Sequence, residues 1–141
     1  MKVQYISSVS VITADAAASR RLYIDALGLP LEKLDGDYYA SEKVEGSKHF
    51  GVWPLTQAAQ ACFGTPDWPG EVTVPQVSIE FELGSLAEVG EAAQELTDQG
   101  HVLLHRARTE PWGQIVARLL SPEGSVVGLS YAPWQHETSP G

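Results

Sequence analysis

The side chains of this chain that could do chemistry are four histidines, one cysteine, and several hydroxyl and acidic residues. The histidines are His49, His101, His105 and His136, and Cys62 is the only cysteine. His101 and His105 fall in one predicted extended segment, about 13 Å apart, which is too far to share a metal ion. Cys62 has no histidine nearby in sequence, which favours a buried thiol over a nucleophile. This set predicts no nucleophile and no metal site.

A second group combines hydroxyl, carboxylate and indole side chains at alternating positions of predicted strands. Ser8 and Ser10 alternate with valines in one strand, and Ser78 and Glu80 alternate with apolar residues in another. Because neighbouring strand residues point to opposite faces of a sheet, these polar side chains should share one face. Arg118 is interpreted either as a specificity residue or as a partner of Glu80. We therefore predict one ligand-binding surface, formed by Ser8, Ser10, His49, Trp53, Ser78, Glu80, Trp112 and Arg118.

Some of these residues have an ordinary structural alternative. Trp53 and Trp112 suit stacking and cation–π contact with a planar, cationic molecule, but indoles are also common core and loop anchors. Glu80 and Glu82 could act as a general base, but lining a polar surface is the commoner role of glutamate. No catalytic residue is therefore predicted.

Two copies of one strand–helix pattern must position this surface. The first copy runs from Ser8 to Gly28 and the second from Ser78 to Gly100. Asp15 and Ser85 are expected to cap the two helices, and a left-handed glycine should end each of them. Apolar residues at helical spacing are expected to pack on the sheet: Leu22, Tyr23, Ala26 and Leu27 in the first helix, and Leu86, Val89, Ala92, Ala93 and Leu96 in the second.

Three shorter strand-like runs follow each helix, so that each half reads as a βαβββ unit. The predicted strands are residues 31–34, 38–44 and 49–54 in the first half, and 101–106, 114–120 and 126–131 in the second. The prediction is an α+β fold, with two βαβββ modules forming a curved mixed sheet of half-barrels and the helices on its outer face.

Composition shifts divide the chain. The predicted parts are a first module over residues 1–56, a linker rich in Gly and Pro over 57–75, a second module over 76–132, and a mobile tail over 133–141.

Charge and composition exclude several classes of partner. The net charge of −9 argues against nucleic acid and anionic membranes, and it tolerates a cationic ligand. No run of about 18 apolar residues and no signal-peptide pattern is found. A single cysteine cannot form an intrachain disulfide, so a reducing, cytoplasmic location is expected.

Several short motifs, in this order, resemble the vicinal oxygen chelate superfamily. They are Asp-Ala-Ala-Ala-Ser at 15–19, Leu-Tyr at 22–23, Leu-Gly at 27–28, Pro-Trp-Gly-Gln at 111–114 and Ser-Pro-Glu-Gly at 121–124. That superfamily includes glyoxalase I, extradiol dioxygenases, fosfomycin-resistance enzymes and bleomycin-resistance proteins. The resemblance spans about residues 3–131, and it implies a cup-shaped sheet in a homodimer whose protomers complete each other's cups.

Catalytic members of that superfamily hold a divalent metal through a His or Gln on the first strand and a Glu on the last strand of each module. The resemblance puts these four positions at Ser8, Ser78, Gly128 and near Trp53. Serine oxygens bind transition metals poorly, and glycine and tryptophan offer no suitable donor. No metal ligand and no cofactor are therefore predicted, and a relocated site using His49, His101 or His105 is the open alternative.

The resulting prediction is a metal-free protein that binds or sequesters a small planar or cationic organic molecule, as the bleomycin-resistance branch does. One alternative is a glyoxalase-like lyase or isomerase, or a dioxygenase, with a non-standard metal site. Another is a regulatory module whose cup docks a peptide or carrier protein.

Overall fold

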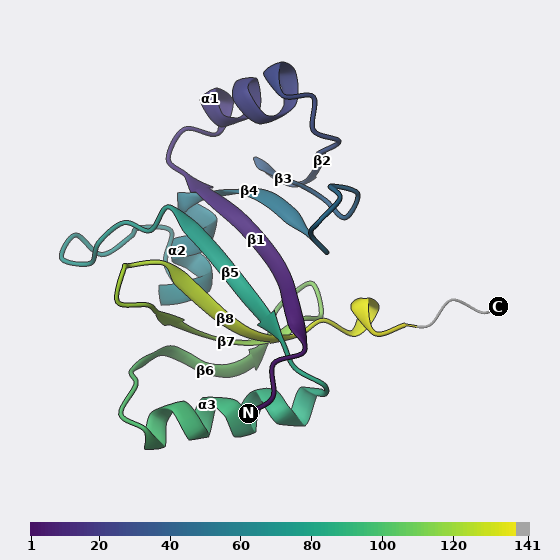
Figure 1. Ribbon diagram of the computed structural model, residues 1–141. Coiled ribbons are helices and arrows are strands. Elements are labelled where there is room, and N and C mark those ends of the chain that lie inside the picture. Colours follow the sequence, from purple (N-terminus) through teal and green to yellow (C-terminus); the bar gives the residue numbers. More distant parts are fainter. Residues whose placement is uncertain (138–141) are drawn as a thin grey trace.

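The computed structural model describes residues 1–137. In this part of the chain eight strands form one curved, open sheet in the order β2-β3-β4-β1-β5-β8-β7-β6 (Figure 1). The strands are β1 (Tyr5–Thr13), β2 (Glu32–Asp35), β3 (Tyr38–Ser41), β4 (Phe50–Pro54), β5 (Val77–Glu82), β6 (Leu103–Thr109), β7 (Ile115–Leu120) and β8 (Val126–Tyr131). The predicted α+β fold of two βαβββ modules is confirmed.

The two modules meet at the antiparallel pair of β1 and β5. Ser8 lies opposite Glu80 and Ser10 opposite Ser78. On either side of this pair the order repeats, because β1 pairs in parallel with β4 and β5 pairs in parallel with β8. The sheet therefore has an approximate twofold axis between β1 and β5, which relates Ser8 to Ser78 and Ser10 to Glu80.

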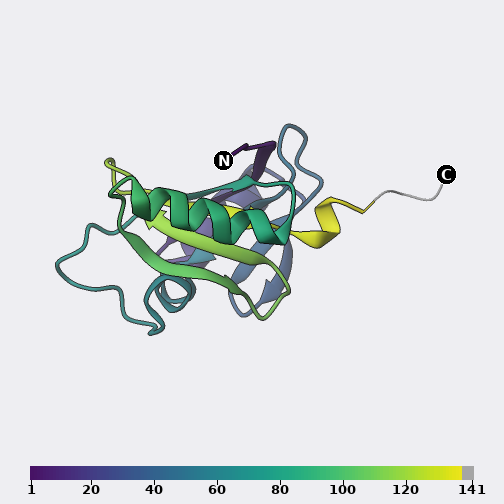
Figure 2. The same cartoon turned by 90° about the horizontal axis from the view of Figure 1, so that it is seen from below.

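The second-module helix α3 (Leu86–Asp98) forms over the predicted residues. The prediction that Leu86 belongs to its buried stripe is wrong, because this residue lies in the first turn of the helix and is 61% exposed. Ser85 caps it by accepting a hydrogen bond from the Glu88 amide at 3.3 Å, and Gly100 follows with a φ of +93°. Figure 2 shows α3 lying along one face of the strands. Its apolar side packs there in a core made of Leu83, Val89, Ala92, Ala93, Ala117 and Leu129. The opposite, concave face is left for polar residues.

The first-module helix departs from its predicted pattern. Asp15 caps α1 (Ala16–Arg20) as expected, accepting from the Ala18 amide at 3.0 Å. The chain then changes to a π-helical segment, η1 (Arg21–Ala26), in which the Leu27 amide donates to the Leu22 carbonyl. This wider turn breaks the 3.6-residue spacing. The predicted buried stripe is therefore wrong, since Leu22 and Leu27 are 51% and 58% exposed.

The segment predicted as a linker begins inside a helix. α2 (Leu55–Phe63) buries Ala58, Ala59, Ala61 and Cys62 and ends at Gly64, whose φ is +75°. Because many turn residues follow this short, alanine-rich helix, the sequence pattern predicted a linker over the whole segment. α2 contacts β1 and β4 of the first module and β6 of the second, so it joins the two halves.

The segment predicted as a mobile tail is also structured where it is described. Pro133–Gln135 forms a 3₁₀ turn, η2, and the side-chain Nε2 of Gln135 donates to the Ser7 carbonyl at 3.1 Å. His136 Nε2 lies 2.8 Å from the fully buried Glu82 carboxylate and its ring stacks on Tyr131. Residues 138–141 of the predicted tail lie outside the described part. No helix within residues 1–137 is long and apolar enough to cross a membrane.

The cap of α3 provides a direct stability test. Ser85→Ala removes the side-chain acceptor for the Glu88 amide, so we expect the free energy of unfolding to fall by about 1 kcal/mol. Chemical denaturation measures this change. Ser85→Asp restores an acceptor and should recover most of the stability, whereas an equal loss in both variants would contradict the capping role.

Candidate functional site

A cavity of about 550 Å³ opens on the concave face of the sheet. All eight residues of the predicted ligand-binding surface line it: Ser8, Ser10, His49, Trp53, Ser78, Glu80, Trp112 and Arg118. They converge because the strands alternate as expected and because β1 and β5 run side by side at the centre of the sheet. The structure thus brings the whole predicted set to one place.

Further residues line the cavity that sequence reasoning did not assign to it. They include Asp35, Tyr38, Glu42, Gln114, Trp134 and Gln135. Gln114 belongs to the Pro-Trp-Gly-Gln motif and could have been found there. Trp134 and Gln135 come from η2, in the segment predicted as a mobile tail. Tyr38 depends on the pairing of β3 with β4, for which the sequence carries no direct signal.

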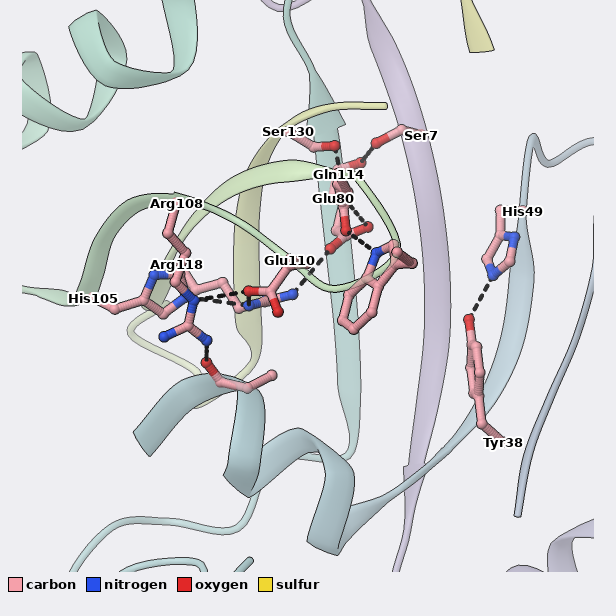
Figure 3. Close-up of polar contacts among 12 residues, drawn as sticks. Ser7, Tyr38, His49, Glu80, His105, Arg108, Glu110, Gln114, Arg118 and Ser130 are labelled. Carbon is pink, nitrogen blue, oxygen red and sulfur yellow. Dashed lines mark hydrogen bonds and ion pairs between the residues drawn. The ribbon is translucent and has the colours of Figure 1, made fainter. Parts of the chain in front are cut away.

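Tyr38 and His49 form a half-buried polar pair on the first-module wall (Figure 3). The Tyr38 hydroxyl lies 2.5 Å from His49 Nε2. Burial raises the pKa of Tyr38 and lowers the pKa of His49, so both groups are neutral near pH 7. We assign the shared proton to Tyr38, with His49 Nε2 as the acceptor. Nε2 of the His49 imidazole is therefore occupied by the hydrogen bond from the Tyr38 hydroxyl.

Arg118 is the centre of the second-module wall. Its side chain is 1% exposed, and Nη1 donates to Glu110 Oε1 at 3.0 Å. Nη1 also lies 3.2 Å from Nε2 of His105, whose pKa is lowered mainly by burial. The main partner of Arg118 is thus Glu110 and not Glu80, whose Oε2 lies 3.9 Å from Nη2. Sequence reasoning missed Glu110, which precedes the motif at 111–114.

Glu110 is held ionised by two arginines. Arg108 Nε donates to Glu110 Oε1 at 2.9 Å, and Arg108 Nη2 donates to the Ala61 carbonyl of α2. Burial opposes ionisation of Glu110, but the hydrogen bonds and charges of Arg108 and Arg118 outweigh it and hold its pKa below the ordinary value. Glu110 therefore neutralises much of the Arg118 charge and anchors its guanidinium.

Glu80 is linked to the rim of the cavity through Gln114 (Figure 3). Gln114 Nε2 donates to Glu80 Oε1 at 3.0 Å and to Ser130 Oγ at 2.8 Å. Trp112 Nε1 donates to Gln114 Oε1 at 2.9 Å, so the amide is fixed at both ends. The Glu80 side chain is 14% exposed. Burial raises its pKa, and Arg118 and Gln114 oppose that shift only in part.

Glu82 and Cys62 play no part in the cavity. Glu82 is fully buried beyond it, accepts from the Ala132 amide at 2.5 Å, and binds His136. It therefore anchors the chain after β8, and its interpretation as a general base or as polar lining of the cup is wrong. Cys62 is a buried thiol whose pKa is raised by burial to about 11, which is unsuited to a nucleophile.

Solved structures with the same architecture identify the fold. Methylmalonyl-CoA epimerase from Mycobacterium tuberculosis superposes with a TM-score of 0.59 at 17% identity, over 94% of this chain and 91% of that chain. A glyoxalase/bleomycin resistance protein/dioxygenase superfamily member from Vibrio splendidus 12B01 has a TM-score of 0.56 at 10% identity, over 92% and 98%. The chain has the vicinal oxygen chelate fold.

A dioxygenase of this fold is also similar in structure. The 2,2',3-trihydroxybiphenyl 1,2-dioxygenase from Sphingomonas wittichii strain RW1 gives a TM-score of 0.57 at 15% identity, covering 90% of this chain and 42% of that one. No protein-family model and no curated sequence matches the chain. The likeness therefore establishes the vicinal oxygen chelate fold and leaves the activity to be argued from the cavity.

The strand register shows which residue of the first module is equivalent to Gly128 of the second. Glu80 pairs with Gly128, and Ser10, its twofold equivalent, pairs with Gly51. The first-module equivalent of Gly128 is therefore Gly51, two residues before the expected position near Trp53. This equivalence follows from the pairing of β1 with β4, which the sequence does not give.

Side chains from elsewhere fill the space above both glycines. A Cβ at Gly51 would lie 2.9 Å from Tyr38 Cε2 and 3.0 Å from Ser10 Oγ. A Cβ at Gly128 would lie 3.0 Å from Glu80 Cγ. The set Ser8, Gly51, Ser78 and Gly128 offers no carboxylate, imidazole or thiolate, so it does not fit the metal that the fold family implies.

A relocated metal site finds no support in the arrangement of donors. Within residues 1–137, no group of three or more His, Cys, Asp or Glu side chains is placed to hold a metal ion. His49 Nε2 faces Tyr38, and His105 Nε2 faces the Arg118 guanidinium, whose positive charge opposes a nearby cation.

Substitution of the two glycines tests this packing. Gly128→Ala and Gly51→Ala should each lower the free energy of unfolding by about 1–3 kcal/mol, because Glu80 or Tyr38 must move to make room. Thermal and chemical denaturation measure the loss. Gly90→Ala, at an exposed α3 position with no atom within 4 Å of the new Cβ, is the control and should stabilise by about 1 kcal/mol. Unchanged stability in both site variants would contradict the close packing.

Titration of His49 tests the neutral Tyr38–His49 pair. The imidazole should keep a pKa below 6.5 in the folded protein, because burial penalises its charged form. As the pH falls below 6.5, His49 therefore becomes protonated in the unfolded chain before it does so in the native state. This difference favours the unfolded chain, so His49 makes the protein less stable as the pH falls. Proton NMR of the imidazole, assigned with His49→Gln, measures the value. A pKa above 6.5 would contradict His49 as the acceptor.

Proposed function

We propose that the chain binds a small planar or cationic organic molecule in this cavity without using a metal, a role of the bleomycin-resistance type. The observation that supports this proposal is the set of residues at the bottom of the cavity. Serines and glycines stand at the four positions where catalytic relatives hold metal, and Tyr38 and Glu80 cover the glycines.

The cavity walls support a flat ligand. Three indoles from the described residues line it, those of Trp53, Trp112 and Trp134. Trp112 is 52% exposed and Trp134 39% exposed, so both present apolar surface at the rim. A volume of about 550 Å³ suits a drug-sized molecule. Aromatic side chains bind planar molecules by stacking, and they favour cations through their negative ring faces.

Charge in the cavity favours a cationic group at its mouth. Asp35, Glu42 and Glu80 line the cavity with a single arginine, Arg118, and Glu110 already offsets that arginine. The local charge is therefore negative, as is the net charge of −9 for the chain. A ligand cation would gain from this field.

We also propose a cytoplasmic homodimer. Strands β2 and β6 end the described sheet, and each has only one strand neighbour. Leu22 and Leu27 add exposed apolar surface next to the first module. Pairing with a second copy would cover such edges and surface. Cytoplasmic placement rests on the lone, buried thiol of Cys62.

Titration with a flat cationic dye tests the binding role. Proflavine should quench the tryptophan fluorescence of the purified protein in a saturable way. Trp53→Phe should weaken its binding about three- to tenfold, because the smaller ring offers less stacking surface. Trp68→Phe is the matched control, since Trp68 donates to the Val72 carbonyl outside the cavity. If neither proflavine nor a panel of intercalating and glycopeptide antibiotics quenches fluorescence or shifts the melting temperature, the proposal fails.

A further inference from the structure

The turn that follows β8 forms part of the cavity wall and has little support of its own. η2 (Pro133–Gln135) contributes Trp134 and Gln135 to the lining, and none of its residues is buried. Figure 1 shows this turn beyond the end of β8. A helical turn of three residues is not stable in isolation. The position of the Trp134 indole therefore depends on what holds η2 against the sheet.

One carboxylate oxygen holds both ends of η2. Glu82 Oε2 accepts at 2.5 Å from the amide of Ala132, the residue just before the turn. The same oxygen lies 2.8 Å from Nε2 of His136, the residue just after it. The His136 ring also stacks on Tyr131 of β8, with the two ring centroids 4.5 Å apart. The turn can therefore move away from the sheet only if these contacts break.

The bond between His136 and Glu82 is the strongest side-chain contact of the turn. Glu82 is fully buried, and within residues 1–137 no lysine or arginine pairs with it, so His136 is its basic partner. The other side-chain contact is a neutral hydrogen bond from Gln135 Nε2 to the Ser7 carbonyl. Hydrogen bonds that involve an ionised group are about twice as strong as neutral ones. Loss of the His136 side chain should therefore release η2.

We propose that His136 is a positioning residue of the cavity: its bond to Glu82 fixes η2, so that the Trp134 indole is already in place to pack against a flat ligand. The inference rests on the proposed small-molecule binding and adds a residue that controls the affinity from outside the cavity. Neither His136 nor Glu82 lines the cavity. Both therefore act on the ligand through Trp134.

A fixed indole should raise the affinity because less conformational freedom is lost on binding. Trp134 lies at the rim and is 39% exposed, so the sheet alone does not confine its side chain. Without the His136 side chain, η2 would become ordered only as the ligand binds, and ordering a segment on binding lowers the affinity. Trp53 lies on β4 and Trp112 is held by Gln114, so these two indoles stay in place. Binding should therefore weaken without being lost.

A double-mutant cycle tests whether His136 acts through Trp134. His136→Ala alone should weaken proflavine binding about tenfold, as measured by fluorescence quenching or calorimetry. In a Trp134→Ala background the same substitution should change the affinity by less than about twofold, because no indole remains to be positioned. His101→Ala, at an exposed position outside the cavity, is the matched control and should bind proflavine as the unmodified protein does.

A conservative variant and a spectroscopic readout separate positioning from a general loss of structure. His136→Gln keeps a nitrogen donor for Glu82 and should recover most of the affinity. In nitrogen-edited NMR of His136→Ala, the indole N–H signal of Trp134 should move. The signal of Trp68, which donates to the Val72 carbonyl outside the cavity, should stay in place. Circular dichroism and melting temperature check that every variant folds.

The unmodified protein supplies an independent measurement if His136→Ala does not fold. The amides of Gln135 and His136 donate to the carbonyls of Ala132 and Pro133. Saturating proflavine should slow the exchange of these two amides with solvent about tenfold, because the ligand binds more tightly when η2 is in place. The Gln99 amide at the end of α3, which donates to the Glu95 carbonyl, should exchange at an unchanged rate.

The outcomes distinguish this inference from the proposed function. Equal binding of proflavine to His136→Ala and to the unmodified protein, or unchanged exchange of the two η2 amides, would overturn the positioning role alone. So would an equal loss of affinity in the Trp134→Ala background. No recovery in His136→Gln would overturn the role of the bond to Glu82. Failure of every planar probe to bind the unmodified protein would overturn both the positioning role and the proposed function.

Discussion

The antiparallel pairing of β1 with β5 determines the rest of the site. One register places Ser8 opposite Glu80 and Ser10 opposite Ser78, and the approximate twofold axis follows from it. A slip of one residue would turn the serines and Glu80 toward α3 and would bring Ile79 and Phe81 into the cup. The core around α3 opposes that slip, because Leu83, Ala117 and Leu129 pack with the helix from the outer face. The packing of the apolar face against α3 thus determines which side chains face the cavity.

Equivalent positions in the two modules have different surroundings. Gly51 and Gly128 are twofold equivalents, but an aromatic ring covers the first and a carboxylate covers the second. Ser10 and Glu80 are likewise equivalent, and only Glu80 has an ionisable side chain. The first-module wall is consequently a neutral Tyr38–His49 pair, whereas the second-module wall is a charged network of Arg118, Glu110 and Glu80. This asymmetry gives the cavity distinct ends, which suits a ligand that is itself asymmetric.

The periodic patterns of the sequence correctly predicted features that depend on one strand or one helix alone. Strand alternation brought Ser8, Ser10, Ser78 and Glu80 to one face, and the cap and spacing of residues 85–100 predicted α3. The failures lie where distant segments meet or where the backbone departs from regular geometry. A π turn exposes Leu22 and Leu27. The choice of Gly51 over Trp53 needs the register of β1 on β4, and the pairing of Arg118 with Glu110 needs a bend between strands that no periodic pattern encodes.

We propose that this cup binds its ligand with its own side chains and without a metal. The most direct measurement is the affinity of the protein for proflavine before and after exhaustive chelation, and again after addition of zinc, nickel, manganese or ferrous ions. We predict the same affinity in every case, because serines and glycines stand where the ligands of a metal would have to be. Binding that is lost on chelation and restored by one of these ions would contradict the account.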